Sequence, residues 1–189
     1  MTPDEFVNQY EFVYHVCYED NWKSIQRHGL LCASVLLTRG DFEEKNRARL
    51  ERMRRPSVSA FTLDGEKVFI RDQKPTVPDE NYHLALNERV YFFVGEDGKK
   101  KAENLCEVYR KKGDTQRILK IGSRKLLNAH SGEVELHPLN VGAQRNLPEN
   151  WRSKWFVPLR NWHPQKKIAE MTIVGSVPEI MNMLAPDFE

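Results

Sequence analysis

Apolar residues occur along the chain in short runs of roughly four to seven positions, which is the usual length of β-strands. The clearest run is RVYFFV at residues 89–94, a continuous apolar pattern typical of a central strand. Asp64-Gly65 lies between two further runs and predicts a hairpin turn. Strands are predicted at residues 11–17, 57–63, 67–70, 89–94, 117–122, 133–139 and 168–174.

Helix-end signals predict short helices between these strands. Trp22 and Ile25 are about one helical turn apart, and Gly29 follows at the position where glycine ends many helices. The charged segment 41–55 precedes Pro56 and predicts an exposed helix. Helices are predicted at residues 22–28, 41–55, 102–112, 123–129 and 177–184. Strands with short helices between them predict a single α+β domain over residues 1–189.

Composition narrows the class of protein. Apolar residues make up 40% and charged residues 30% of the chain, which is close to an ordinary globular domain. No stretch approaches the ~20 apolar residues of a membrane span, and the early acidic residues Asp4 and Glu5 do not fit a signal peptide. Three cysteines without a CxxC pair fit a reducing compartment. We therefore expect a cytoplasmic protein without a membrane partner, and the scattered histidines indicate no metal site.

The net charge of +2 hides an uneven distribution. Residues 97–128 contain ten Lys or Arg against four Asp or Glu, and residues 144–167 contain six against one. Together with the tryptophans of the second segment, this combination is typical of proteins that bind single-stranded nucleic acid. The alternative is that the lysines form a solvated surface and the tryptophans belong to the core. The tryptophans concerned are Trp151, Trp155 and Trp162.

A family motif is found in residues 14–31, YHVCYEDNWKSIQRHGLL. Asn21 follows His15 by six positions, and Ser24-Ile25 and Gly29-Leu30 come next. This pattern resembles the opening motif of the DarT-type ADP-ribosyltransferases, and a similar His-bearing first strand occurs in the tRNA 2′-phosphotransferases. The resemblance implies an ADP-ribosyltransferase-like fold with a mixed or antiparallel split β-sheet, short flanking helices, and NAD as co-substrate.

The far end of the chain carries a second match. Residues 168–180, IAEMTIVGSVPEI, resemble the family's closing strand, whose catalytic glutamate falls on Glu170. Residues 49–55, RLERMRR, resemble a helical segment with an NAD-contacting arginine, either Arg54 or Arg55. The middle of the chain departs from DarT. Its segments RDQKP and HPLNVG resemble an uncharacterised bacterial family related to that group.

The resemblance implies transfer of ADP-ribose from NAD to a nucleobase of single-stranded DNA or RNA by a toxin or phage-defence effector. An antitoxin or a reversing hydrolase would be a further partner. Such a reaction passes through an oxocarbenium-like transition state that a nearby carboxylate stabilises. Glu170 would supply the carboxylate and accept a proton, and His15 would bind a ribose hydroxyl. Asn21 would reach the same nucleotide, and the cations suited to the pyrophosphate are Arg54, Arg55 and Arg71.

Structural alternatives exist for these residues. A lone histidine such as His15 is commonly structural, and Asn21 is a good helix cap. Arg54 and Arg55 fit a solvated helix face, and Arg71 fits a salt-bridged turn. The alternation of residues 168–173 does not say whether Glu170 faces a cleft or bulk water.

A competing carboxylate and two other functions also remain open. Glu135 lies in a Val-Glu setting in which other ADP-ribosyltransferases carry their glutamate, but the Val-Pro that follows Glu170 favours the latter. The acceptor could also be a protein side chain. A third hypothesis is a non-catalytic nucleotide-binding module of the same fold.

Overall fold

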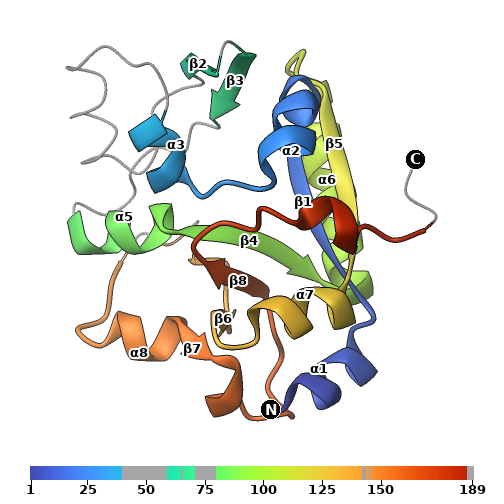
Figure 1. Cartoon of the computed structure of the whole chain (residues 1–189). Coiled ribbons are helices and arrows are strands. Elements are labelled where there is room, and N and C mark those ends of the chain that lie inside the picture. Colours follow the sequence, from blue (N-terminus) through green and yellow to red (C-terminus); the bar gives the residue numbers. More distant parts are fainter. Residues whose placement is uncertain (40–58, 65, 71–79, 142–143, 145, 187–189) are drawn as a thin grey trace.

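A computed structural model describes residues 1–39, 59–64, 66–70, 80–141, 144 and 146–186 (Figure 1). The chain forms an α+β structure whose centre is a six-stranded sheet in the order β5-β1-β4-β8-β6-β7. Neighbouring strands in this sheet pair antiparallel throughout. The α+β class is thus confirmed. The six strands are β1 (Phe12–Tyr18), β4 (Arg89–Val94), β5 (Gln116–Gly122), β6 (Val134–His137), β7 (Val157–Pro158) and β8 (Glu170–Val174).

Strand β4 joins the two halves of the sheet. Its first four residues pair with β8, from Arg89 opposite Val174 to Phe92 opposite Met171. Its last two residues pair with β1, which continues along its full length beside β5. The ladder between β1 and β4 covers only two residue pairs, so these two strands separate along most of their length.

One face of the sheet, here called the first face, carries the main hydrophobic core. Val90, Phe92, Met171 and Ile173 alternate onto this face and are buried. The helices that contribute to this core include α1 (Pro3–Gln9), α2 (Trp22–His28) and α7 (Ser123–His130), through Phe6, Ile25, Leu126 and Leu127. The closing segment with the 3₁₀ turn η4 (Ile180–Met183) crosses the same face, in front of the sheet in Figure 1.

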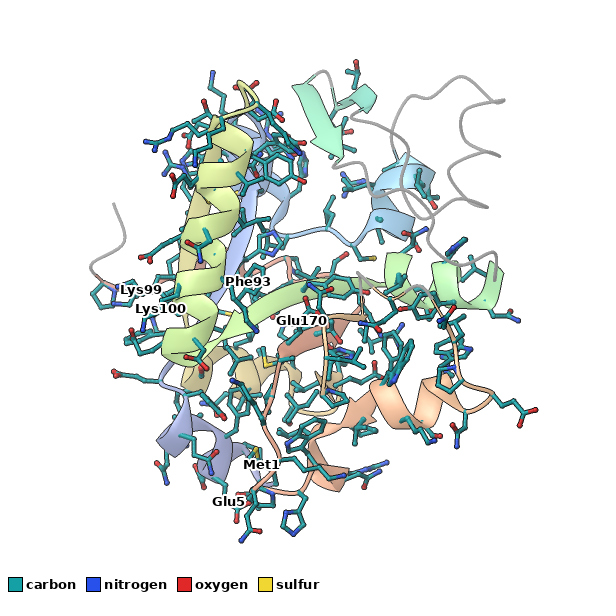
Figure 2. All side chains as sticks on the ribbon, turned by 180° about the vertical axis from the view of Figure 1, so that it is seen from behind. Met1, Glu5, Phe93, Lys99, Lys100 and Glu170 are labelled. Atoms are coloured by element: carbon teal, nitrogen blue, oxygen red, sulfur yellow. The ribbon has the colours of Figure 1, made fainter. Side chains whose placement is uncertain are left out.

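The opposite, second face is covered by different helices. Helix α6 (Gly95–Arg110) packs along β1, β4 and β5, and lies in front of them in Figure 2. Helix α5 (Glu80–Asn87) and helix α8 (Trp151–Trp155) contribute to a separate aromatic cluster. Its buried members are Tyr82, Leu86, Val141, Trp155 and Phe156, with Tyr91 packed against them. The residues of β4 and β8 that face this side include Arg89, Tyr91, Phe93, Glu170 and Thr172.

The remaining described elements lie at the periphery. The hairpin of β2 (Ser59–Leu63) and β3 (Glu66–Ile70) forms a second sheet, as Asp64-Gly65 predicts. Asp64 has φ of 49° and pairs with Arg39 at 2.9 Å and with His28 at 3.3 Å. These contacts tie the hairpin to α2 and to α3 (Ala33–Arg39), while η1 (Glu19–Asn21) lies against β3. The short turn η3 (Leu159–Asn161) contacts β6.

Two helix predictions differ from the structure. Helix α6 begins at Gly95 rather than near residue 102, because Glu96 and Asp97 favour its N-terminus and Gly98 fits closely over Phe93. The helix predicted at 177–184 is only the turn η4, because bridges Leu30–Val177 and Ile121–Leu184 hold both ends of the segment extended. The helix predicted at 41–55 lies outside the described residues. No helix in the described ranges is long and apolar enough to span a membrane.

Gly29 ends α2 as its sequence position predicts, and it also permits a close approach of two distant segments. Its φ of 75° is a conformation that favours glycine. A Cβ at this position would lie 2.3 Å from Cα of Pro178. The next residue, Leu30, donates its N–H to the carbonyl of Val177 at 3.0 Å. The opening motif and the closing segment therefore meet at this glycine.

Gly29→Ala should destabilise the protein by roughly 2–5 kcal/mol, since it adds a clash to the strain of the backbone conformation. Gly113→Ala is the matched control, because Gly113 has φ of 87° but a Cβ at its position would meet nothing within 4 Å. It should cost only the strain, about 1–2 kcal/mol. Urea unfolding measures both values. Equal losses in the two variants would contradict the close contact between Gly29 and Pro178.

Candidate functional site

Glu170 begins strand β8 on the second face of the sheet. The register places His137 directly opposite it on β6 and Tyr91 opposite Thr172 on β4. Only 7% of Glu170 is exposed to solvent. The carboxylate therefore does not face bulk water, which was one of the two alternatives that the alternating pattern left open. Figure 2 shows Glu170 and Phe93 on this side of the sheet.

The Glu170 carboxylate is held by the backbone of Val141. The Val141 N–H donates to Oε2 of Glu170 at 3.1 Å, and Val141 is fully buried. The carbonyl of the same residue accepts a hydrogen bond from the hydroxyl of Tyr82. This contact fixes the position of one carboxylate oxygen of Glu170 against the backbone of Val141.

Helix α5, which carries Tyr82, is fastened to β4 by its last carbonyl groups. Arg89 Nη1 donates to the carbonyl of Ala85, and the hydroxyl of Tyr91 donates to that of Leu86 at 3.1 Å. The last carbonyls of a helix have no partners within the helix, so these two side chains complete its C-terminus. Arg89 and Tyr91 project from the second face, so α5 is fixed above the same surface as Glu170.

Glu135, the competing carboxylate, forms an ion pair with Arg89. The Arg89 Nε lies 2.7 Å from Oε2 of Glu135, and the two side chains are 2% and 17% exposed. The guanidinium also lies over the ring of Phe156, 4.7 Å from its centroid. A buried guanidinium requires a counter-charge. The structure therefore gives Glu135 a structural role as the counter-ion of Arg89.

Glu135→Gln should destabilise the protein by about 3 kcal/mol, because it removes the nearest counter-ion of the buried Arg89 charge and leaves only the half-exposed Glu88, whose Oε2 lies 3.9 Å from Nη1. Glu107→Gln is the control, since Glu107 pairs with Lys111 at the surface, 3.0 Å away, with both side chains at least half exposed. That substitution should leave the urea midpoint unchanged. Equal midpoints for wild type and Glu135→Gln would show that the ion pair does not support the fold.

His137 is fully buried beside Glu170 and serves as a neutral link between strands. Its Nδ1 lies 2.5 Å from the carbonyl of Trp155, so Nδ1 carries the proton and donates. Nε2 then accepts from the hydroxyl of Thr172 at 2.9 Å. Burial lowers the pKa of His137 from its usual 6.5 to about 3, although the Trp155 carbonyl opposes this shift. The site thus contains a neutral imidazole at physiological pH.

The depressed pKa of His137 makes stability depend on pH. Between about pH 6.5 and 3 the unfolded chain binds a proton at this residue and the folded protein does not, so stability falls as pH decreases. We expect a contribution of up to about 1.4 kcal/mol per pH unit. His137→Asn should reduce the slope of unfolding free energy against pH, measured with urea between about pH 4 and 6. His163→Asn, at an exposed position, should retain the wild-type slope. Identical slopes for all three proteins would contradict this assignment.

His15 lies where β1 and β4 separate. Its Nδ1 is 2.8 Å from the carbonyl of Tyr91, two residues before Phe93, which pairs with Tyr14 at the end of that ladder. The imidazole thus binds a β4 carbonyl in the part of the strand that has separated from β1. Because a carbonyl only accepts, Nδ1 carries the proton, and Nε2 of the neutral ring is an acceptor. In this tautomer Nε2 can accept a hydrogen bond from a hydroxyl group of a ligand.

The register does not place His15 and Glu170 on the same face. Tyr14 is opposite Phe93 and shares the second face with Glu170. His15 leaves β1 on the first face, where its ring centroid is 5.8 Å from that of Phe92. The two predicted catalytic residues therefore lie on the two strands beside β4, His15 on β1 and Glu170 on β8. The His15 side chain contacts β4 where β1 and β4 separate.

Asn21 occupies the N-cap position of α2, but its side chain makes no capping hydrogen bond to the helix. The turn before it is held instead by Glu19 and Arg117, whose closest atoms are 2.6 Å apart, and Arg117 lies over the ring of Trp22 at 4.7 Å. Arg117 lowers the pKa of Glu19. The helix-cap alternative for Asn21 is therefore not observed. The arginines predicted to bind pyrophosphate, Arg54, Arg55 and Arg71, lie outside the described residues.

The aromatic residues of segment 144–167 are mainly structural. Trp155 and Trp162 are 8% and 3% exposed, so neither presents an open face for base stacking. The alternative prediction, that these tryptophans belong to the core, is therefore correct. The residues that the sequence did not single out are Tyr82, Arg89 and Val141. Arg89 is the first residue of the apolar run RVYFFV, and its charge within a buried strand is the one signal that pointed to it.

The fold and the site define an α+β protein with a buried, hydrogen-bonded carboxylate on the second face of its antiparallel sheet. Residues 11–184 match a family described as a family of unknown function (DUF7002), and the chain belongs to this family. No curated protein matches the chain. The family description assigns no activity, so function has to be argued from the site.

Proposed function

We propose that this protein is an NAD-dependent ADP-ribosyltransferase that modifies a nucleobase of DNA or RNA and releases nicotinamide. The observation that carries the proposal is the buried carboxylate of Glu170, which the motif of the closing strand identifies independently. Its neighbour across the sheet, His137, is neutral, and the Val141 N–H holds one carboxylate oxygen at 3.1 Å. A buried carboxylate held in place by a backbone N–H would, in its ionised form, be suited to stabilising a cationic transition state.

In the proposed reaction, the bond between the ribose C1′ and the nicotinamide nitrogen breaks, and nicotinamide leaves with the bonding electron pair. The positive charge that develops on the ribose is stabilised by Glu170. A nucleobase nitrogen or oxygen then forms a bond to C1′ and loses its proton, which Glu170 accepts. His15 leaves the sheet on the opposite face from Glu170. NAD would therefore have to pass the point where β1 and β4 separate for Nε2 of His15 to accept a hydrogen bond from a ribose hydroxyl and for Asn21 to contact the same nucleotide.

A nucleic-acid acceptor is supported by the way the fold brings basic segments together. Lys167 binds Asp97 at 3.0 Å, and Lys100 and Lys101 lie close enough to lower the pKa of Asp97 further. Lysines from two separate basic segments thus surround one aspartate near the start of α6. Figure 2 shows Lys99 and Lys100 on this helix, which covers the same face as Glu170. Such a cluster attracts phosphates in a salt-dependent manner.

Glu170→Gln tests the chemistry while preserving the structure, because the amide oxygen still accepts from Val141 but cannot take a proton. We expect transfer of label from NAD to single-stranded DNA or RNA to fall by about 10²–10⁴-fold, with an unchanged urea midpoint. The acceptors are single-stranded DNA, RNA and cell protein, each incubated separately with NAD labelled in the adenosine part, and free nicotinamide is measured in parallel.

The acceptor assay also separates the alternative functions. Label on protein alone would replace the nucleobase acceptor by a protein side chain. Wild-type protein that binds NAD but releases no nicotinamide would be a non-catalytic module and would overturn the proposal. Full activity in Glu170→Gln, or selective loss of activity in a folded Glu135→Gln variant, would transfer the catalytic role away from Glu170.

A further inference from the structure

Val141 is held from both sides by two polar side chains. Its N–H donates to Glu170 at 3.1 Å, and its carbonyl accepts from the hydroxyl of Tyr82. All three residues are buried. We infer that Tyr82 is a positioning residue that acts through Val141 to orient the Glu170 carboxylate for reaction. This inference rests on the proposed function for its catalytic consequence, but the structural coupling stands apart from it.

The ring of Tyr82 has little freedom to move. It is fully buried and makes edge contacts with Trp151, Trp155 and Phe156, at centroid distances of 5.0, 6.1 and 6.4 Å. These contacts fix the direction of the hydroxyl, because a tyrosine O–H lies at the end of a rigid ring. The hydroxyl therefore holds the Val141 carbonyl at a defined point above the sheet.

The helix that carries Tyr82 is fixed in turn by residues of the sheet. Arg89 and Tyr91 of β4 bind the carbonyls of Ala85 and Leu86 at its C-terminal end. Glu135 of β6 holds the Arg89 guanidinium at 2.7 Å. A continuous set of contacts thus runs from β6 through β4 and α5 to Tyr82, and then through Val141 to Glu170 on β8.

Loss of the Tyr82 hydroxyl would leave the buried carbonyl of Val141 without this donor. Because a buried carbonyl without a partner is costly, residue 141 would turn to find another donor. That movement would withdraw the N–H from Glu170 and remove a contact that favours its ionised form. A purely structural role for Tyr82 would lower stability without changing the titration of Glu170.

Tyr82→Phe tests this coupling while retaining the packing of the ring. The titration of the Glu170 carboxyl is followed by NMR in protein labelled with ¹³C at glutamate side-chain carboxyls, with Glu170→Gln to assign the signal. We expect its midpoint to move to higher pH by about one unit. Tyr10→Phe is the control, since Tyr10 is half-buried against Phe6 and Gly95, away from α5. In Tyr10→Phe the Glu170 carboxyl should titrate as it does in wild type.

A second measurement uses the wild-type protein and therefore does not depend on the folding of a variant. The amide proton of Val141 should shift with pH at the same midpoint as the Glu170 carboxyl, because the two groups share a hydrogen bond. In Tyr82→Phe this shared titration should be lost. An unchanged Glu170 midpoint in folded Tyr82→Phe, or a Val141 amide insensitive to Glu170 in wild type, would overturn the inference.

The catalytic consequence is measured separately. In Tyr82→Phe, kcat should fall roughly ten- to a hundredfold with little change in KM for NAD, and the acid limb of the rate profile should move to higher pH. The transfer assay with wild-type protein tests the proposed function first. Absence of transfer in wild type would defeat the proposed function, whereas the NMR titrations would still decide whether Tyr82 controls Glu170.

Discussion

The buried charge of Arg89 is the constraint on which the second face of the sheet depends. A guanidinium that is almost fully removed from water must find a counter-charge and acceptors, since the cost of leaving it unpaired exceeds most single packing gains. Here Glu135, the Ala85 carbonyl and the ring of Phe156 satisfy it. One side chain of β4 thereby joins β6, α5 and the aromatic cluster, and their assembly fixes the surroundings of Glu170.

Local signals predicted the parts of the fold that depend on backbone conformation. Gly29 ends α2 with φ of 75°, and Asp64 lies in the hairpin turn with φ of 49°, a backbone geometry that few residues adopt. Helix α5 was not predicted, since its sequence ENYHLALN has weak periodicity and its C-terminus is completed by side chains of the following strand. Contacts with the sheet stabilise this helix, and a local sequence pattern does not reveal such contacts.

The sequence could predict only those parts of the candidate site that are side chains. Glu170 follows from the motif of the closing strand, and its burial then follows from the structure. Its partner is the N–H of Val141, a group that every residue except proline possesses, so no sequence signal could identify it. The register likewise decides that His15 and Glu170 leave the sheet on different faces beside β4. A fold supports many functions, and the placement of these few groups has to specify the chemistry.

The central claim is that the Glu170 carboxylate lies where the nicotinamide ribose of NAD binds. A crystal structure with a non-cleavable carbocyclic analogue of NAD tests this claim most directly. The account predicts the ring that replaces this ribose within hydrogen-bonding distance of Glu170, with the Val141 N–H still bound to the carboxylate. An analogue bound elsewhere on the protein, with no contact to Glu170, would contradict the account.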